Sequence, residues 1–236
     1  MKAMKRIGLI GGLGPESTLD YYREIINSFK DEKGTLNYPE VIIYSVNLSE
    51  FLNYMKIKAY DQVVTVFLEK ITALKNAGAD FAAITANTPH LLFDQISKRS
   101  ELPLISIVEA TCREAVRKGL KKPGLFGTGF TMSATFYQAS FNQHGMEVVI
   151  PAQRDREVIH NKLFSEIEQG IFKDETRQIL LDILQRMVRE NHIDSLILGC
   201  TEFPLILPQV EYAGIPMLNT TQIHVKAIVE YCSSGK

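Results

Sequence analysis

A cysteine that directly follows a short apolar run is the first residue whose type and position suggest chemistry. The run 195–198 is too short for a helix and is typical of a buried strand, which ends at Gly199. Cys200, Thr201 and Glu202 follow, so a thiol, a hydroxyl and a carboxylate would lie at the carboxyl edge of a sheet, where open α/β sheets bind ligands. The start of a helix at this point would lower the pKa of the Cys200 thiol and favour the reactive thiolate.

A second strand end in the chain has a similar pattern of polar residues. Most free cysteines are small apolar fillers of a core, so Cys200 alone would be weak grounds for a catalytic site. The apolar run that ends at Thr85 is followed by Ala86, Asn87 and Thr88, with His90 two residues further on. Two polar strand ends of this kind favour a site built from both.

The composition is that of an ordinary globular protein. The 236 residues are 45% hydrophobic and 22% charged, enough for one large domain or two of modest size. The 26 basic and 27 acidic side chains nearly cancel, and no block of like charge stands out. Nucleic-acid and membrane-surface binding therefore lack their usual electrostatic signature, and neither partner is expected.

The N-terminus and the cysteines indicate a cytoplasmic protein. The basic residues 1–6 precede an apolar run that stops at Gly11, which is too short for the core of a signal peptide. Cys112, Cys200 and Cys232 are odd in number, far apart and without the paired spacing of a zinc site, so no metal is expected. Reduced thiols in the cytoplasm fit this usage.

Strands and helices are expected to alternate along the whole chain, which predicts parallel sheets joined by right-handed crossovers. The expected strands cover residues 7–10, 41–46, 81–85, 104–107, 124–127, 147–150, 194–198 and 216–219. The expected helices cover residues 15–29, 60–77, 109–118, 154–169, 174–191 and 221–231, with a further helix that begins at Pro89 and another through Phe136, Tyr137 and Phe141. The glycine turn 11–14 matches neither G-x-G-x-x-G nor a P-loop, because Ser17 takes the place of the third glycine and no Gly-Lys-Ser/Thr follows.

The order of these landmarks repeats, which predicts two similar α/β domains. The glycine turn at Gly11 corresponds to the one at Gly127, and the polar edge after Thr85 corresponds to the edge after Gly199. From this symmetry the first domain is expected to comprise residues 1–103 plus 215–236, and the second domain residues 104–214.

Four motifs together resemble the aspartate/glutamate racemase family. They are residues 11–18, 86–90, 128–132 with Tyr137, and 199–202, in the order in which the family has them. The resemblance implies two parallel-sheet α/β domains in a pseudo-symmetric arrangement with the site in the cleft between them, and a homodimer. It also implies amino-acid racemisation without pyridoxal phosphate, metal or any other cofactor.

The same resemblance implies two catalytic cysteines, one from each domain. Cys200 matches the second of them, whereas the first position is Ala86, whose methyl group can neither accept nor donate a proton. Thr85, one residue away, Thr88 or a bound water could take its place. Substrate binding is implied for Gly12, Asn47, Asn87, Thr88, Thr128, Thr131 and Thr201, although such residues also cap helices and close turns.

Because of Ala86, three interpretations remain open. The first is a racemase of aspartate, glutamate or a related amino acid with Cys200 as one acid/base. The second is a single-cysteine decarboxylase or isomerase of small dicarboxylic acids on the same scaffold. The third is an inactive homologue that binds dicarboxylates.

Overall fold

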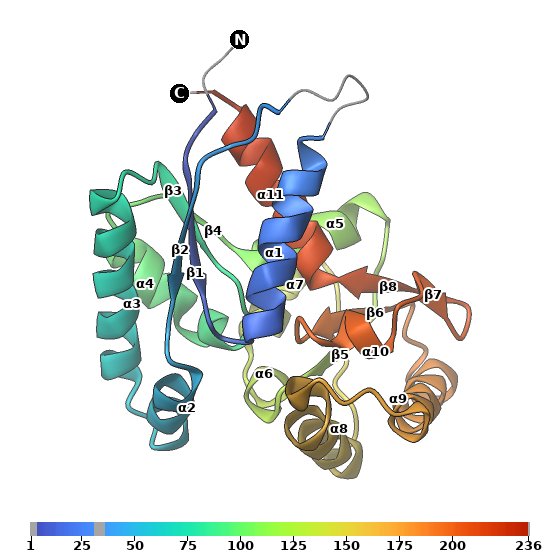
Figure 1. Ribbon diagram of the computed structural model, residues 1–236. Coiled ribbons are helices and arrows are strands. Elements are labelled where there is room, and N and C mark those ends of the chain that lie inside the picture. Colours follow the sequence, from blue (N-terminus) through green and yellow to red (C-terminus); the bar gives the residue numbers. More distant parts are fainter. Residues whose placement is uncertain (1–3, 31–35, 236) are drawn as a thin grey trace. The chain divides into compact units, whose positions relative to one another are not determined.

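The chain divides into two compact units, each with its own sheet (Figure 1). The computed structural model describes residues 4–30 and 36–235. The first unit is formed by Met1–Ile107 with His224–Lys236, and the second by Val108–Ile223. The chain therefore crosses from one unit to the other twice.

The first unit contains a parallel four-stranded sheet in the order β2-β1-β3-β4. Its strands are β1 (Ile7–Gly11), β2 (Val41–Ser45), β3 (Phe81–Ile84) and β4 (Leu104–Ile105). Its helices are α1 (Pro15–Ser28), α2 (Leu48–Lys56), α3 (Tyr60–Asn76), the 3-10 helix η1 (Thr88–Leu92) and α4 (Phe93–Arg99). Most of α11 (Thr220–Ser233) also belongs to this unit.

Helices cover both faces of this sheet. Ile7 and Leu9 lie in one buried cluster with Tyr21 of α1 and Ile228 of α11. Gly8 points to the other face, where a methyl group in its place would lie 3.1 Å from the side chain of Leu74 on α3. Figure 1 shows α3 on one side of the sheet and α1 with α11 on the other. A sheet covered on both faces explains why β1 is apolar at every position.

The second unit contains a sheet in the order β5-β6-β8-β7, in which only β7 is antiparallel. Its strands are β5 (Pro123–Gly127), β6 (Ser195–Gly199), β7 (Glu211–Tyr212) and β8 (Ile215–Asn219). Its helices are α5 (Ile107–Arg117, which starts at the last residue of the first unit), α6 (Gly129–Ser133), α7 (Phe136–Asn142), α8 (Gln153–Ser165), α9 (Asp174–Arg186) and α10 (Phe203–Ile206). The 3-10 helix η2 (Ile167–Gln169) follows α8, and the π-helix η3 (Met187–Asn191) extends α9.

The core of the second unit joins the strands to the long helices that follow them. Phe126 of β5 and Leu198 of β6 lie in one buried cluster with Leu163 of α8, Leu184 of α9 and Phe203 of α10. In the described parts of the chain, no helix is long and apolar enough to cross a membrane.

The expected fold class, two similar parallel-sheet α/β domains, is confirmed, although individual elements differ locally from those expected. The expected strand 147–150 is reduced to one parallel bridge between Val149 and Gly124, although it occupies the place beside β5 that β2 occupies beside β1. The short helix α2 was not expected. The expected strand 216–219 is β8, but it pairs with β6 in the second sheet, whereas the expected domains placed it in the first.

The crossings between the units also differ from those that symmetry suggested. The structure places them after Ile107 and after Ile223, whereas the expected boundaries lie near Pro103 and Gly214. The pairing of β8 with β6 keeps that strand in the second unit, so the second crossing falls inside α11.

Candidate active site

The glycine turn after β1 is held by a threonine of the following helix. The hydroxyl of Thr18 accepts a hydrogen bond of 2.9 Å from the amide of Gly12 and donates one of 3.2 Å to the carbonyl of Gly14. Gly12 has φ of +81°, and a methyl group there would lie 2.3 Å from the carbonyl oxygen of Val46. The turn therefore requires glycine at this position and presents backbone rather than side chains.

The edge after β3 carries the residues that correspond to the first catalytic position. Ala86 is buried, and its carbonyl accepts a hydrogen bond of 2.9 Å from Nδ1 of His90. The hydroxyl of Thr85 is also buried and donates to the carbonyl of Ile10 over 3.2 Å. Thr85 would have to give up this bond before its hydroxyl could donate a proton to any other group. Asn87 and Thr88 are buried at the same edge.

Asn47 stands between the end of β2 and the start of α2. Its side-chain oxygen accepts hydrogen bonds from the amides of Ser49 and Glu50, so it caps the helix. It also lines a cavity of about 260 Å³ in the first unit. Among the described residues that line the cavity, one is basic: Lys70 of α3, whose ammonium lies 5.0 Å from the ring centre of Tyr44. The sequence between Ser45 and Lys56 has no such group.

The second unit repeats this arrangement at the ends of β5 and β6. Gly127 and Gly199 are partners in adjacent parallel strands, so Thr128 and Cys200 leave the sheet at the same edge. Thr128 caps α6 by accepting a hydrogen bond of 3.1 Å from the amide of Thr131. A methyl group on Gly127 would lie 2.9 Å from the side chain of Thr131. Gly127 thus lets Thr131 pack closely on the end of β5, whereas Gly199 lets β5 and β6 approach each other, because its methyl group would lie 2.7 Å from the carbonyl oxygen of Phe126.

The thiol of Cys200 lies between two carboxyl groups. Its sulfur is 2.9 Å from Oε2 of Glu202 and 3.5 Å from Oε1 of Glu168. The hydroxyl of Thr201 donates to the same oxygen of Glu202 over 3.0 Å. Cys200 is 7% exposed and also touches the apolar core of its unit, but its sulfur has polar neighbours rather than only aliphatic ones.

These neighbours reverse the expected effect on the thiol. Burial, followed by the charges of Glu202 and Glu168, raises the pKa of Cys200 well above its ordinary value. The expectation of a pKa lowered by a helix start is wrong, because α10 has only four residues and begins three positions later. Burial and the charge of Glu202 raise the pKa of Glu168 to about 8. Near neutral pH the cluster therefore holds a protonated thiol beside a protonated carboxyl.

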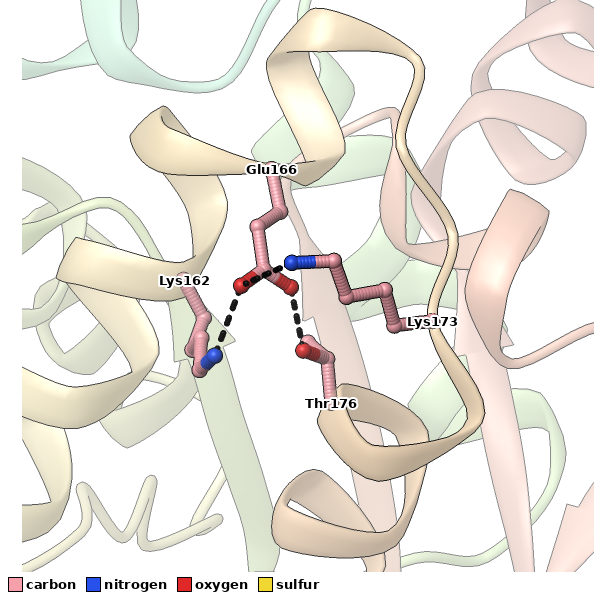
Figure 2. Close-up of polar contacts among 4 residues, drawn as sticks. All are labelled: Lys162, Glu166, Lys173 and Thr176. Atoms are coloured by element: carbon pink, nitrogen blue, oxygen red, sulfur yellow. Dashed lines mark hydrogen bonds and ion pairs between the residues drawn. The ribbon is translucent and has the colours of Figure 1, made fainter.

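A separate ion-pair cluster fixes the turn that carries Glu168 (Figure 2). Glu166, at the end of α8, binds the ammonium groups of Lys162 and Lys173 over 2.7 and 3.3 Å and accepts a hydrogen bond from the hydroxyl of Thr176. The bonds from Lys162 and Thr176 lower the pKa of Glu166 to about 2. Glu166 thus anchors the turn through η2 to both α8 and the start of α9.

A family model described as Asp/Glu/Hydantoin racemase matches residues 10–228. The chain belongs to this family. The broad-specificity amino-acid racemase RacX of Bacillus subtilis is 25% identical over 226 residues, which cover 94% of this chain and 96% of the relative. The structure of an aspartate racemase homologue from Pyrococcus horikoshii is 34% identical and has a TM-score of 0.84, covering 98% of this chain and all of the homologue. Aspartate racemase from Picrophilus torridus shares the fold, with a TM-score of 0.74. It is 20% identical, and the match covers 96% of this chain and 94% of that racemase.

In this member of the Asp/Glu/hydantoin racemase family, sequence reasoning missed one group beside the thiol, Glu168. It lies 32 positions before Cys200, and no local spacing connects the two. One carboxylate oxygen each of Glu168 and Glu202 and the sulfur of Cys200 lie within 4.8 Å of one another, so the three could also bind one metal ion. Burial and the charges of Glu202 and Glu168 raise the pKa of the Cys200 thiol, so the motif 199–202 alone does not predict its protonation state.

Proposed function

We propose that this protein is a cofactor-independent amino-acid racemase that acts on aspartate or glutamate through Cys200. The observation that carries the proposal is the Cys200 thiol at the end of β6 with two carboxyl groups in contact. Membership of the racemase family supports the class of reaction. The α-proton of an amino acid is very weakly acidic, so its removal needs a positioned base and donors around the developing negative charge.

The cluster supports a proton path for one face of the substrate. The thiol proton passes to a carboxylate oxygen, for which Glu202 is the nearest at 2.9 Å. The thiolate then takes the α-proton and becomes a thiol again, and the electron pair stays on the substrate carbon. A second acid, for which we propose the hydroxyl of Thr85 or Thr88 or a bound water, gives a proton to the opposite face of the carbanion and yields the other enantiomer. Glu202 then releases its extra proton to solvent, and the second acid regains one from solvent. Because the pKa of Cys200 is raised, we expect activity to increase with pH above neutrality.

We assign substrate binding to both strand edges. Gly12, Asn87 and Thr88 belong to the edge of the first unit, and Thr128 and Thr131 to the edge of the second. Thr201 and Asn47 complete the proposed set, in which backbone amides, hydroxyls and side-chain amides bind the carboxylate and amine of the substrate. The similarity to a broad-specificity racemase supports testing neutral amino acids as well.

Ala86 favours a second candidate function. A buried methyl group stands where the family resemblance places the first cysteine, and the hydroxyl of Thr85 is bound to Ile10. With Cys200 as the single thiol, the site could protonate an enediolate from one side, as a decarboxylase or isomerase of small dicarboxylic acids would require. Thr85 is our candidate hydroxyl for the other face, provided that its bond to the carbonyl of Ile10 opens.

Incubation in deuterated water separates the candidates. The protein is given L-aspartate, L-glutamate and several neutral amino acids, while optical rotation and α-deuterium are followed together. Racemisation with exchange is the expected result. Exchange with retained configuration would favour one-sided chemistry, and binding by calorimetry without either would identify an inactive dicarboxylate binder.

Three cysteine variants test the assignment of the thiol. We expect Cys200→Ser to abolish turnover while the protein stays folded, and Ala86→Cys to increase racemisation. Cys112→Ser is the matched control, because this cysteine is also buried in the second unit but lies on α5. Unchanged turnover in Cys200→Ser would remove Cys200 from the mechanism, and no gain in Ala86→Cys would remove position 86.

We further propose a homodimer in a reducing compartment such as the cytoplasm. The resemblance to the racemase family supports the dimer, and the three buried free cysteines support the compartment. Sedimentation equilibrium at several protein concentrations tests the dimer, for which a single monomer mass would be the contrary result.

A further inference from the structure

Two buried histidines of the first unit form a pair that holds several backbone positions together. The rings of His90 and His224 lie 6.4 Å apart in an edge-on arrangement, and Phe93 stacks on His90 at 4.8 Å. His90 is 3% exposed and His224 is fully buried. Neither ring has a place in the proposed proton path.

The hydrogen bonds of His90 join the edge at Ala86 to Ile107, where the chain first crosses to the second unit. Nδ1 is 2.9 Å from the carbonyl oxygen of Ala86, and Nε2 accepts a hydrogen bond of 3.3 Å from the amide of Ile107. Ile107 is the last residue before the chain enters the second unit. One imidazole thus bridges the residue at the first catalytic position and the point at which the chain leaves this unit.

His224 makes a corresponding set of bonds at the second crossing. It is the first residue after the chain returns from the second unit. Its Nε2 lies 2.9 Å from the carbonyl oxygen of Ile105, and its Nδ1 lies 2.8 Å from the hydroxyl of Tyr21. Both crossings are therefore tied to the same pair of rings.

The protonation state of His90 is fixed by its partners. Because Nε2 accepts from an amide, the ring proton must be on Nδ1, where it donates to the carbonyl of Ala86. Burial, with a smaller contribution from His224, lowers the pKa of His90 to about 3. The ring stays neutral in any physiological buffer, so the two bonds persist together.

We propose that His90 is a positioning residue that couples the Ala86–Asn87 edge to the backbone at Ile107, where the chain leaves the first unit. Substrate binding at the edge would then also restrict the backbone at Ile107. This inference rests on the proposed function, because that function makes the edge a substrate site. It assigns His90 no contact with the substrate.

Two substitutions of His90 each keep one of its hydrogen bonds and remove the other. In His90→Asn the amide nitrogen takes the place of Nδ1, so the bond to Ala86 is kept and the bond to Ile107 is lost. In His90→Gln the amide oxygen takes the place of Nε2, so the opposite bond is kept. Ile107→Pro removes the amide proton without changing His90, and proline is tolerated at the first position of α5. His144→Asn, at an exposed histidine, is the control.

Amide hydrogen exchange tests the tie in the ligand-free protein. We expect the Ile107 amide to exchange at least tenfold faster in His90→Asn than in the wild type, His90→Gln or His144→Asn. Equal exchange at Ile107 in all four proteins would overturn the proposal. This result does not depend on activity. It therefore tests the bond between His90 and Ile107 even if no amino acid is racemised and the proposed function fails.

Kinetics and ligand-induced protection test the coupling. With saturating L-aspartate or L-glutamate, whichever is turned over, the wild type should gain protection at both Asn87 and Ile107, and His90→Asn only at Asn87. We expect kcat of His90→Asn and Ile107→Pro to fall at least tenfold while KM stays within twofold. Equal protection at Ile107 in wild type and His90→Asn, or kcat within twofold of wild type in both variants, would leave His90 a purely structural residue.

Discussion

Replacing Glu168 with glutamine should stabilise the protein at alkaline pH and change its stability little at acid pH. In the unfolded chain a glutamate loses its proton near pH 4.5, whereas in the folded protein Glu168 keeps it until about pH 8. Between these values the folded state holds the extra proton, so the stability of the wild type falls as pH rises. Glutamine has no proton to lose and resembles the neutral carboxyl.

The size of the effect follows from the two pKa values. Each unit between 4.5 and about 8 corresponds to ~1.4 kcal/mol, so ionised Glu168 costs up to about 5 kcal/mol of unfolding free energy. Relaxation of the turn and water entering beside the carboxylate reduce this figure. We expect the advantage of Glu168→Gln to be about 2 kcal/mol larger at pH 8.5 than at pH 5.

Urea denaturation followed by circular dichroism from pH 5 to pH 9 measures this difference. Glu230→Gln serves as the control, because Glu230 is an exposed glutamate on α11. Parallel stability curves for wild type and Glu168→Gln, or a gap that is widest at pH 5, would refute the burial argument. A gap of equal size in Glu230→Gln would show a general effect of charge.

Three further substitutions have defined outcomes. Glu166→Gln should lower the urea midpoint at pH 7 and do so less at pH 3, because the pKa of Glu166 is lowered to about 2 by its bonds to Lys162 and Thr176 and that stabilisation is lost as pH falls. Gly12→Ala should cost more stability than Gly145→Ala in the same urea assay, because both have positive φ but only Gly12 has backbone atoms within 3 Å of the added methyl. Gly199→Ala should cost about 1–3 kcal/mol, because its methyl would lie 2.7 Å from a neighbouring side chain and a carbonyl oxygen; a cost no larger than that of Gly145→Ala would contradict the close packing.

Sequence patterns were sufficient for most of the fold, since buried parallel strands leave a strong local signal. The runs that became β1 and β6 are apolar at nearly every position and end in glycine. The signal failed for 147–150, which forms a single bridge at Val149 instead of a strand. It was present but unused for α2, where Asn47 and Glu50 have the spacing of a helix start.

The candidate site was less predictable, because its chemistry depends on contacts between distant residues. Cys200 and its two successors were identified from one segment, but Glu168 comes from a turn that Glu166 fixes elsewhere in the chain. The sign of the thiol pKa shift depends on those carboxyl groups and on burial, neither of which a motif shows. For the same reason the bond between His90 and the amide of Ile107 could not be predicted from the sequence.

The division of the first unit into two segments of sequence has a consequence for biosynthesis. Val225, Ile228 and Cys232 fill the cluster that covers β1 and β3, yet the ribosome makes them after the whole second unit. The second unit is encoded without interruption and precedes them, so it can fold during translation. The first segment must wait with an apolar face bare until α11 has been made, so we expect it to need a chaperone while the second unit is synthesised.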